Sequence, residues 1–501
     1  MSIQHMKEES SGTTSISSIT ASRRVLTGIP GLDEVLCGGL ISQRAYLLRG
    51  GPGSGKTTLG LQFLMEGATA GERCLCITLS EPPDEIRKNA RSIGLDLEPI
   101  HFLDLSPEVD FFARHESYDI FTSAEVEREP LAQQIITQVE ALKPQRVFLD
   151  AMTQFRFLSS DAFQFRKQVL SFLRFLVEQG ATVMFTSEGN DANPDDDLQF
   201  MSHGIIHLDV ARDRRTIRIS KFRGSEFRGE THDMRLTAQG IVVFPHLLPR
   251  LYQRTFVREA LSSGIPELDE LLHGGLERGT ISIVTGASGV GKTTLGLQFM
   301  KEAAARGERS SVYIFEEWKE TLVERCEGIN VHVHAMLEQG MLSITQVEPL
   351  HFTPDEFANM VRREVEKHQT RIVMIDSASG YRLALGGDGL VNHLHALCKY
   401  LQYMGVTVLL INEVEAITGE FRVTEVGISY LADNIVFLRY LEMDGELHKC
   451  IGVLKKRLSG FEKTLHEINI DRYGIRVGKP LSQVRGLLTG RIEVADLSNK
   501  R

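Results

Sequence analysis

Two glycine-rich segments of this chain have residue types that suit phosphate binding. Residues 50–57 read Gly-Gly-Pro-Gly-Ser-Gly-Lys-Thr, and residues 286–293 read Gly-Ala-Ser-Gly-Val-Gly-Lys-Thr. In this pattern the glycines let backbone N–H groups point at phosphate oxygens, the lysine reaches the β- and γ-phosphates, and the last hydroxyl reaches Mg²⁺. We therefore predict two nucleotide sites. Their expected contacts are Gly53, Ser54, Gly55, Lys56, Thr57 and Thr58 in the first loop, and Ser288, Gly289, Val290, Gly291, Lys292, Thr293 and Thr294 in the second.

Each loop is followed, further along the chain, by an apolar run that ends in aspartate. Residues 146–150 read Arg-Val-Phe-Leu-Asp and residues 371–376 read Arg-Ile-Val-Met-Ile-Asp. Such a strand-end acid completes the shell of Mg²⁺ in P-loop enzymes that use ATP. A strand that merely ends in an acid is the alternative for one copy, but two copies in the same order favour the metal site. The predicted metal ligands are Thr57, Asp150, Thr293 and Asp376.

Further carboxylates follow a second strand-like run in each half. Residues 74–81 end in Ser80 and Glu81, whereas residues 311–317 end in Glu316 and Glu317. A carboxylate at the carboxyl end of a parallel strand lies where open α/β sheets bind ligands, and it can act as a base. Side chains alternate along a strand, so Glu316 and Glu317 are expected on opposite faces with different roles.

Late in each half, two basic residues stand one position apart. Lys221 and Arg223 follow one β-type run, and Lys455 and Arg457 follow another. On one side of a strand, two cations suit the charge that develops on a transferring phosphoryl group. A solvated edge strand is the alternative. The two pairs recur at nearly the spacing of the loops, which favours the catalytic interpretation.

These elements belong to an internal repeat. The loop lysines lie 292 − 56 = 236 residues apart, and residues 27–34 (Thr-Gly-Ile-Pro-Gly-Leu-Asp-Glu) return as 263–270 (Ser-Gly-Ile-Pro-Glu-Leu-Asp-Glu). Each half is long enough for a core of its own. We predict a disordered segment over 1–22, domains over 23–250 and 251–482, and a tail over 483–501.

Composition narrows the choice of partners. The net charge of −10 argues against nucleic acid as the main ligand, because such binding needs clustered Lys and Arg. There is no run of 18 apolar residues, so no membrane-spanning segment is expected. The scattered cysteines, including Cys74 and Cys76 on one face of a predicted strand, indicate a reduced, cytoplasmic protein.

With these features the chain resembles the KaiC family of bacterial circadian-clock ATPases and autokinases. Further matches are residues 87–94 after the first acid site and residues 424–433 before the last strands. The resemblance implies an α/β fold of two tandem RecA-like domains, each a twisted, mainly parallel sheet flanked by helices. It also implies a homohexamer whose domains form two stacked rings, with ATP between subunits and the basic pairs acting on a neighbour's nucleotide.

Carried over by position, the resemblance makes Glu316 the general base, with Glu317 beside it, and Ser429 the phosphoacceptor. Thr424 matches a further position near that cycle. Tyr430 stands where the family has a second acceptor, a threonine. Ser80 replaces an acid in the first half, so the first site is expected to be a slow ATPase or a ring-forming module. The set of expected nucleotide contacts is completed by Ser92, Ser225 and Ser459.

The leading functional hypothesis is an ATPase and serine/threonine autokinase in circadian or stress signalling. A second hypothesis is a nucleotide-switched signalling or scaffold ATPase whose shape a regulatory protein partner reads. A third is a RecA-type, DNA-dependent ATPase, since fold alone does not dictate function.

Overall fold

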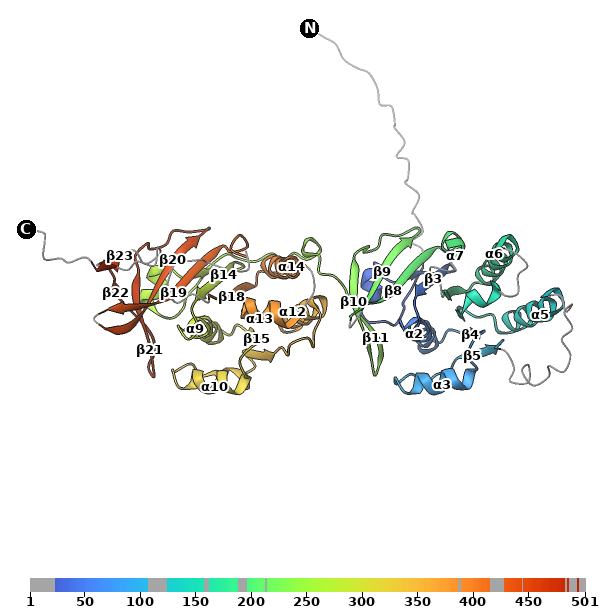
Figure 1. Ribbon diagram of the computed structural model, residues 1–501, viewed down its shortest axis with the longest axis horizontal. Coiled ribbons are helices and arrows are strands. Elements are labelled where there is room, and N and C mark those ends of the chain that lie inside the picture. The colour runs from blue at the N-terminus through green and yellow to red at the C-terminus, as the bar shows by residue number, and fades with distance from the viewer. Residues whose placement is uncertain are drawn as a thin grey trace, which may run out of the picture. The chain divides into compact units, whose positions relative to one another are not determined.

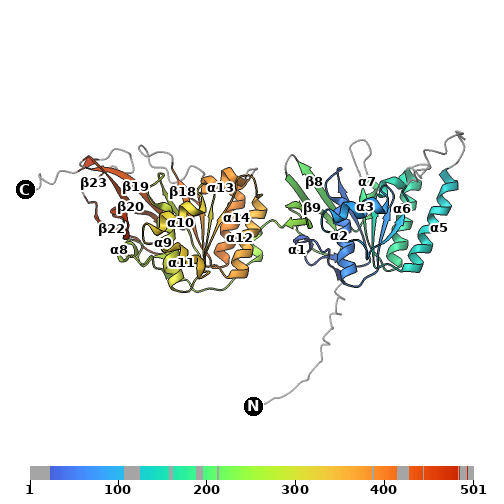
Figure 2. The ribbon, with the colours of Figure 1, turned by 90° about the horizontal axis from the view of Figure 1, so that it is seen from below.

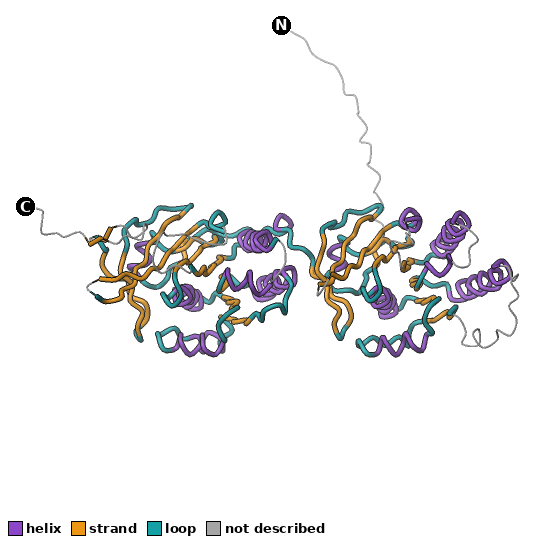
Figure 3. Tube along the Cα trace, in the orientation of Figure 1, coloured by secondary structure: helices purple, strands orange, loops and turns teal. Residues whose placement is uncertain are grey.

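The computed structural model describes residues 23–106, 124–156, 162–187, 196–211, 214–385, 389–414, 428–443, 445–482, 484–485 and 493–494. The predicted disordered segment 1–22, most of the tail and Thr424 lie outside the described residues. The chain divides into two compact units, Met1–Val243 and Phe244–Arg501. In each unit helices flank a central sheet, as the alternation of orange strands and purple helices in Figure 3 shows.

The first unit is built on a nine-stranded sheet of order β11-β10-β9-β8-β3-β7-β6-β4-β5. Strands from β8 to β5 along this order are parallel, and β9 and β10 continue the sheet antiparallel. The strands are β3 (Ala45–Gly50), β4 (Cys74–Thr78), β5 (His101–Asp104), β6 (Arg146–Asp150), β7 (Thr182–Ser187), β8 (Gly204–Ala211), β9 (Arg214–Phe222), β10 (Thr231–Thr237) and β11 (Gly240–Phe244), with β1 (Arg24–Val25) and β2 (Leu40–Ile41) forming a separate pair.

Helices cover both faces of this sheet (Figures 1 and 2). One core cluster joins α2 and α3 to one face, and another joins α5 and α6 to the opposite face. The helices are α1 (Leu32–Val35), α2 (Lys56–Thr69), α3 (Pro83–Arg91), α5 (Ala124–Leu142), the 3₁₀ helix η1 (Met152–Arg156), α6 (Ala162–Glu178) and α7 (Asp196–Met201). Covering both faces explains why the parallel strands read as nearly continuous apolar runs.

The second unit repeats the arrangement, with the order β16-β15-β17-β18-β14-β19-β20-β21-β22. The strands from β16 to β19 along this order are parallel, and β20 to β22 are antiparallel. The strands are β14 (Ile281–Gly286), β15 (Ser310–Ile314), β16 (Leu342–Gln346), β17 (Ile372–Asp376), β18 (Thr407–Glu413), β19 (Asn434–Met443), β20 (Glu446–Lys456), β21 (His466–Asp471) and β22 (Gly474–Pro480), with the short pairs β12 (Ala260–Leu261) and β13 (Leu276–Glu277), and β23 (Val484–Arg485) and β24 (Glu493–Val494).

The helices of the second unit again lie on two faces. One core cluster contains residues of α9, α10 and α11, and another contains residues of α12, α13 and α14. The helices are η2 (Pro249–Leu251), α8 (Pro266–Leu271), α9 (Lys292–Ala305), α10 (Lys319–Glu327), α11 (Val333–Glu338), α12 (Pro354–His368), α13 (Ala378–Leu385) and α14 (Leu390–Tyr403). The predicted α/β class, with two tandem parallel-sheet domains, is confirmed. No helix among the described residues is long and apolar enough to cross a bilayer.

The division between the units falls at 243/244, whereas the sequence places it at 250/251. Leu247 packs in the core of the second unit beside Ile281. The side-chain amide of Asn359 donates a hydrogen bond to the carbonyl of Pro245 at 2.8 Å. The prolines indicate a linker between domains, and these contacts show that residues 245–247 belong to the second unit.

Equivalent glycines in the two P-loop helices meet different neighbours. A Cβ added at Gly60 would lie 2.0 Å from the Phe148 ring, whereas one at Gly296 would lie 2.4 Å from the sulfur of Met374. A rigid ring must shift as a whole, but a thioether can rotate away.

We expect Gly60→Ala to destabilise the first unit by about 1–3 kcal/mol through overpacking. The matched change Gly296→Ala should alter the second unit by less than about 1 kcal/mol, because the helix-propensity gain offsets a small shift of Met374. Hydrogen exchange monitored in each unit at increasing urea concentration measures the change in unfolding free energy at both positions. Equal losses at the two positions would contradict this account.

Candidate functional site

The second phosphate-binding loop joins β14 to α9 at the carboxyl edge of the sheet. Gly291, just before the helix, has φ 114°, a left-handed conformation that glycine adopts without strain. A Cβ at Gly286 would lie 2.3 Å from the carbonyl oxygen of Leu438 on the neighbouring strand. Ser288, Gly289 and Val290 lie in this loop, and Thr294 lies in the first turn of α9. The glycines therefore let the loop pass close to β19.

The side chains that follow Gly291 face the end of β17. The ammonium of Lys292 donates a hydrogen bond to the carbonyl of Ala287 at 2.8 Å, and its burial lowers the pKa of this amine. The hydroxyl of Thr293 donates to Oδ2 of Asp376 at 2.6 Å. Burial raises the pKa of the Asp376 carboxyl to about 6, against the opposing effects of Thr293 and Lys292.

These groups line a cavity of about 450 Å³, a volume in the range of small-molecule sites. Its lining residues are Ser288, Gly289, Gly291, Lys292, Thr293, Thr294, Ile314, Glu316, Glu317, Arg325, Ile329, Asp376, Ser377, Glu413, Lys449 and Ile470. A buried lysine, a helix amino terminus and a hydroxyl–carboxylate pair form a donor set that fits a nucleotide with Mg²⁺. The predicted loop contacts of the second half thus line the cavity together with Asp376, except Val290, whose side chain is buried in the core.

Glu316 and Glu317 both line this cavity, so the prediction that they face opposite sides is wrong. Strand β15 ends at Ile314, and the alternation of side chains ends with it. Glu316 accepts a hydrogen bond from the hydroxyl of Ser377 at 3.3 Å. Glu317 instead receives two hydrogen bonds from Arg325, at 2.7 and 3.2 Å. Their roles still differ, because an arginine holds one carboxylate and a hydroxyl contacts the other.

Several cavity residues were not predicted from the sequence. Arg325 lies on α10, Glu413 ends β18, and Lys449 on β20 donates to the carbonyl of Gly289 at 3.3 Å. Arg325 also lies 3.5 Å from the hydroxyl of Thr294. No short motif joins these positions to the loop. The only usable signals were the eight-residue spacing from Glu317 to Arg325 and the strand-end position of Glu413.

The first loop has the same framework. Lys56 donates to the carbonyls of Gly50 and Gly51 at 2.7 and 2.9 Å. The hydroxyl of Thr57 donates to Oδ2 of Asp150 at 2.6 Å, matching the Thr293 bond in the second unit. The other predicted contacts lie in this loop or the first turn of α2: Gly53, Ser54, Gly55 and Thr58.

The surroundings of this first loop differ from those of the second. Ser80 and Glu81 are exposed after the end of β4. Desolvation raises the pKa of Glu81, and Asp150 and Glu85 add to the shift. The position equivalent to Arg325 is 325 − 236 = 89, which is Asn89. At these equivalent positions the first unit therefore has Ser80 in place of the Glu316 carboxylate and Asn89 in place of the arginine.

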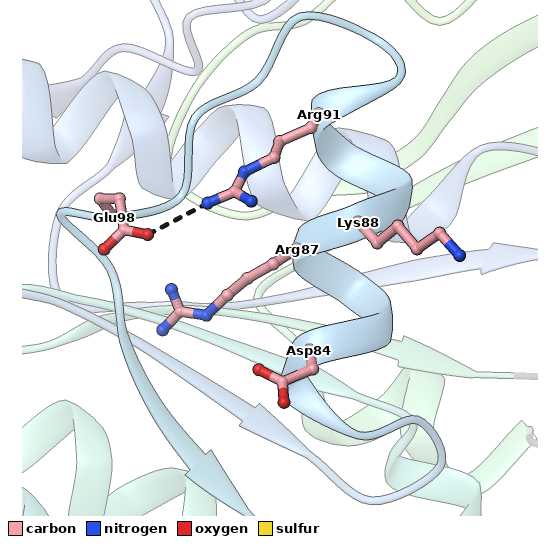
Figure 4. A pocket seen from close by; sticks show the side chains of 5 residues that line it. All are labelled: Asp84, Arg87, Lys88, Arg91 and Glu98. Atoms are coloured by element: carbon pink, nitrogen blue, oxygen red, sulfur yellow. Dashed lines mark hydrogen bonds and ion pairs between the residues drawn. The ribbon is translucent and has the colours of Figure 1, made fainter.

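Helix α3 carries a separate polar pocket near this edge (Figure 4). Its lining residues are Asp84, Arg87, Lys88, Arg91 and Glu98. In Figure 4, Arg91 reaches Glu98 at 3.2 Å, while Lys88 points away from both. The guanidinium of Arg87 lies 4.5 Å from the centre of the Phe102 ring. The predicted contact Ser92 follows this helix, and its hydroxyl donates to the carbonyl of Asn89.

The basic pairs lie away from the loops of their own units. Lys455 pairs with Ile435 where β19 begins, and β19 runs parallel to β14, whose far end carries the loop. Its ammonium donates to the carbonyl of Ala432 at 2.6 Å, and the half-exposed Arg457 donates to Asp433 at 3.0 Å. The length of the six-residue strand, about 20 Å, separates this edge from the loop.

The first unit repeats this separation. Lys221 pairs with Ile205 at the beginning of β8, which is parallel to β3, and donates to the carbonyl of Gln199 at 2.6 Å. Arg223 is exposed just after β9 ends. Ser225 and Ser459 follow the two pairs and contact Arg24 and Glu277 respectively. These predicted residues are not brought to the loop of their own unit.

Ser429 lies on the same edge as Lys455. It is half-buried in the turn that precedes β19. The neighbouring Tyr430 is 54% exposed, and its ring meets that of His395 edge-on, with centroids 5.8 Å apart. The serine therefore lies at the edge that carries the basic pair, opposite the edge that carries the cavity carboxylates Glu316 and Glu317.

The raised pKa of Asp376 predicts a pH dependence of stability in Mg²⁺- and nucleotide-free buffer. The folded pKa of about 6 exceeds the ordinary 3.8, so the folded chain binds more protons between these values and loses stability as pH rises through them. As pH rises from 5 to 7.5, we expect the free energy of unfolding of Asp376→Asn to increase by about 1 kcal/mol relative to that of the original chain. Urea unfolding at each pH measures this difference, and the exposed Glu320→Gln serves as control. If the free energy of unfolding of Asp376→Asn ran parallel to that of the original chain across this pH range, the expectation would be contradicted.

Comparison with known proteins agrees with this geometry. The KaiC ATPase family profile matches the chain twice, over residues 25–247 and 261–482. The chain is 31% identical over 480 residues to the circadian clock protein KaiC3 of a Synechocystis species, covering 93% of both chains. It is 27% identical to the circadian clock oscillator protein KaiC of Acaryochloris marina, over 95% of this chain and 93% of that one.

A further relative is the circadian clock oscillator protein KaiC of Synechococcus elongatus, 28% identical over 93% of this chain and 91% of its own. Both halves of the chain, each with its loop and strand-end aspartate, fall inside the matched regions. The chain is therefore a member of the KaiC family of ATPases.

Proposed function

We propose that this KaiC-family ATPase is also an autokinase that phosphorylates Ser429 across the interfaces of a homohexamer. The observation that carries the proposal is the separation within the second unit. Glu316, Lys292 and Asp376 lie at the carboxyl edge of the parallel strands, whereas Ser429 and the basic pair lie at the amino edge. A chain therefore cannot bring its own serine to its own cavity without breaking the sheet.

Each group has a separate task in the proposed transfer. The loop amides and Lys292 hold the phosphates of ATP, and Thr293 with Asp376 would hold Mg²⁺, which neutralises phosphate charge when bound. Glu316 accepts the proton of the Ser429 hydroxyl of the neighbouring subunit as its oxygen attacks the γ-phosphorus and ADP leaves. Lys455 and Arg457 of that neighbour approach the equatorial oxygens.

The same polarity favours a ring. The carboxyl edge, which carries the cavity, is the donor edge, and the amino edge, which carries Ser429, is the acceptor edge. When the donor edge of one copy meets the acceptor edge of another, the contact is head-to-tail, and such contacts close into a ring when the rotation permits. Six copies are proposed from the family resemblance. The first unit, with Ser80 and Asn89 in place of the second unit's polar partners, is assigned a slower ATPase that supports ring assembly.

The names of the relatives suggest a biological setting. Because several are circadian clock proteins, we assign this chain to circadian or stress signalling in the cytoplasm, with a regulatory protein partner. A nucleotide-switched signalling ATPase without autokinase activity is the second candidate. It is favoured by the fact that both loops keep their Thr–Asp bonds independently of Ser429.

Mixing two inactive variants tests transfer between subunits. Lys292→Ala disables the cavity but keeps Ser429, whereas Ser429→Ala keeps the cavity but removes the acceptor. With Mg-ATP we expect neither variant alone to carry phosphate at position 429, and the mixture to label Ser429 on the Lys292→Ala chain. Mass spectrometry of tagged chains detects the label. Adding Arg457→Ala to the acceptor chain should slow transfer by about 10³-fold or more.

Two outcomes would contradict the autokinase. Phosphate on Ser429 of the isolated Lys292→Ala variant would exclude the proposed cavity. An original chain that turns over ATP at full rate without phosphate on Ser429 would leave the signalling ATPase as the function.

Native mass measures the ring directly. With Mg-ATP we expect a species of about 340 kDa, since each chain is 56.1 kDa, and a shift to smaller species when nucleotide is removed. Arg457→Glu should reduce the large species, because it reverses charge at the acceptor edge, whereas the exposed Arg472→Glu should not. A monomer with undiminished ATP turnover would refute catalysis between subunits.

A further inference from the structure

A second group of ligand-type side chains lies in the second unit, apart from the nucleotide cavity. His246 is in the segment after β11, Asp355 is in the first turn of α12, and His393 is in the first turn of α14. The two helices contact each other, as Figure 2 shows. Three segments distant in the sequence therefore meet at these side chains.

The geometry of the three side chains suits a shared cation. Nδ1 of His246 lies 3.0 Å from Oδ1 of Asp355, and Nδ1 of His393 lies 3.3 Å from the same oxygen. The candidate ligand atoms all lie within 4.8 Å of one another. Zinc–ligand bonds of about 2.0–2.1 Å in a tetrahedron put neighbouring ligand atoms about 3.3 Å apart. The distances of 3.0 and 3.3 Å from Asp355 to the two imidazoles are close to this spacing.

Burial of the Asp355 carboxylate costs free energy unless partner groups compensate for the lost contact with water. The Asp355 side chain is 1% exposed, whereas those of His246 and His393 are 27% and 17% exposed. A buried carboxylate needs a positive or hydrogen-bonding partner. The two imidazoles supply hydrogen bonds, and their partial exposure leaves a path by which an ion and water can enter.

The backbone around the cluster is held in place. The side-chain amide of Asn359 donates to the carbonyl of Pro245 and to that of Asp355, both at 2.8 Å. It thus fixes the residue before His246 and the helix turn that carries Asp355. The imidazole rings meet at 87° with centroids 5.0 Å apart. Supports of this kind orient metal ligands before the ion arrives.

We propose that His246, Asp355 and His393 form a binding site for one divalent transition-metal ion of the zinc class, with water completing its coordination. Two imidazoles and one carboxylate are ligands that zinc accepts, whereas Mg²⁺ prefers oxygen ligands alone. The ion would tie residues 245–247 to α12 and α14. It is therefore distinct from the Mg²⁺ proposed at Thr293 and Asp376, and it does not depend on the autokinase.

Zinc content tests the site. The full chain is stripped with EDTA, saturated with Mg-ATP to occupy the loops, dialysed against Zn²⁺ and measured by elemental mass spectrometry. We expect the original chain to hold one more Zn²⁺ per chain than His246→Gln/His393→Gln. The matched control is His448→Gln, which removes a histidine that contacts Glu467, away from the cluster, and should keep the extra ion.

Thermal unfolding gives an independent readout. Added Zn²⁺ should raise the unfolding midpoint of the original chain and of His448→Gln, but not that of the double variant, because a ligand stabilises only the state that binds it. The single change His393→Gln keeps two ligands and should weaken Zn²⁺ binding by at least tenfold. Equal zinc content in the original chain and the double variant would overturn the proposal and leave a hydrogen-bonded His–Asp–His clamp.

Discussion

The hydrogen bond from a P-loop threonine to a strand-end aspartate depends on the correct placement of the loop, the helix and three strands in each unit. Thr57 meets Asp150 and Thr293 meets Asp376, both at 2.6 Å. The aspartate is on the second strand from the loop strand, with β7 or β18 between them. The bond therefore forms only when three parallel strands are in register and the helix begins where the glycines turn. Both units satisfy this condition with different core side chains.

The phosphate-binding loop and its threonine–aspartate bond are equivalent in the two units, but the side chains around them are not. Glu316, Glu317 and Arg325 surround the second loop, while Ser80, Glu81 and Asn89 occupy the equivalent positions in the first. A carboxylate held by an arginine next to one contacted by a hydroxyl gives the second cavity two distinct acids. The two units therefore share the loop and its threonine–aspartate bond, and they differ in the side chains around them.

Much of this arrangement could be predicted from the sequence, and the predictions that failed did so for identifiable physical reasons. The loops and their aspartates are predictable because each is a short, local pattern bound to a strand end. Alternation misplaced Glu316 and Glu317, since it applies only up to Ile314. Arg325 and Glu413 were missed because packing of α10 and β18, not spacing, brings them to the cavity. His246, Asp355 and His393 lie 109 and 38 residues apart, beyond any motif.

In the proposed autokinase, the polarity of the parallel sheet would make phosphoryl transfer a property of an assembly. Parallel strands put every loop that follows a strand at one edge and every segment that precedes one at the other. Lys292 and Glu316 belong to the first kind of segment, whereas Ser429 belongs to the second, and no side chain spans the intervening strand length. Ser429 precedes β19, and β19 pairs with β14 and β20, so the sheet holds the serine at the edge opposite its own cavity. In the proposed homohexamer, a second copy would supply the missing edge without any change to this pairing.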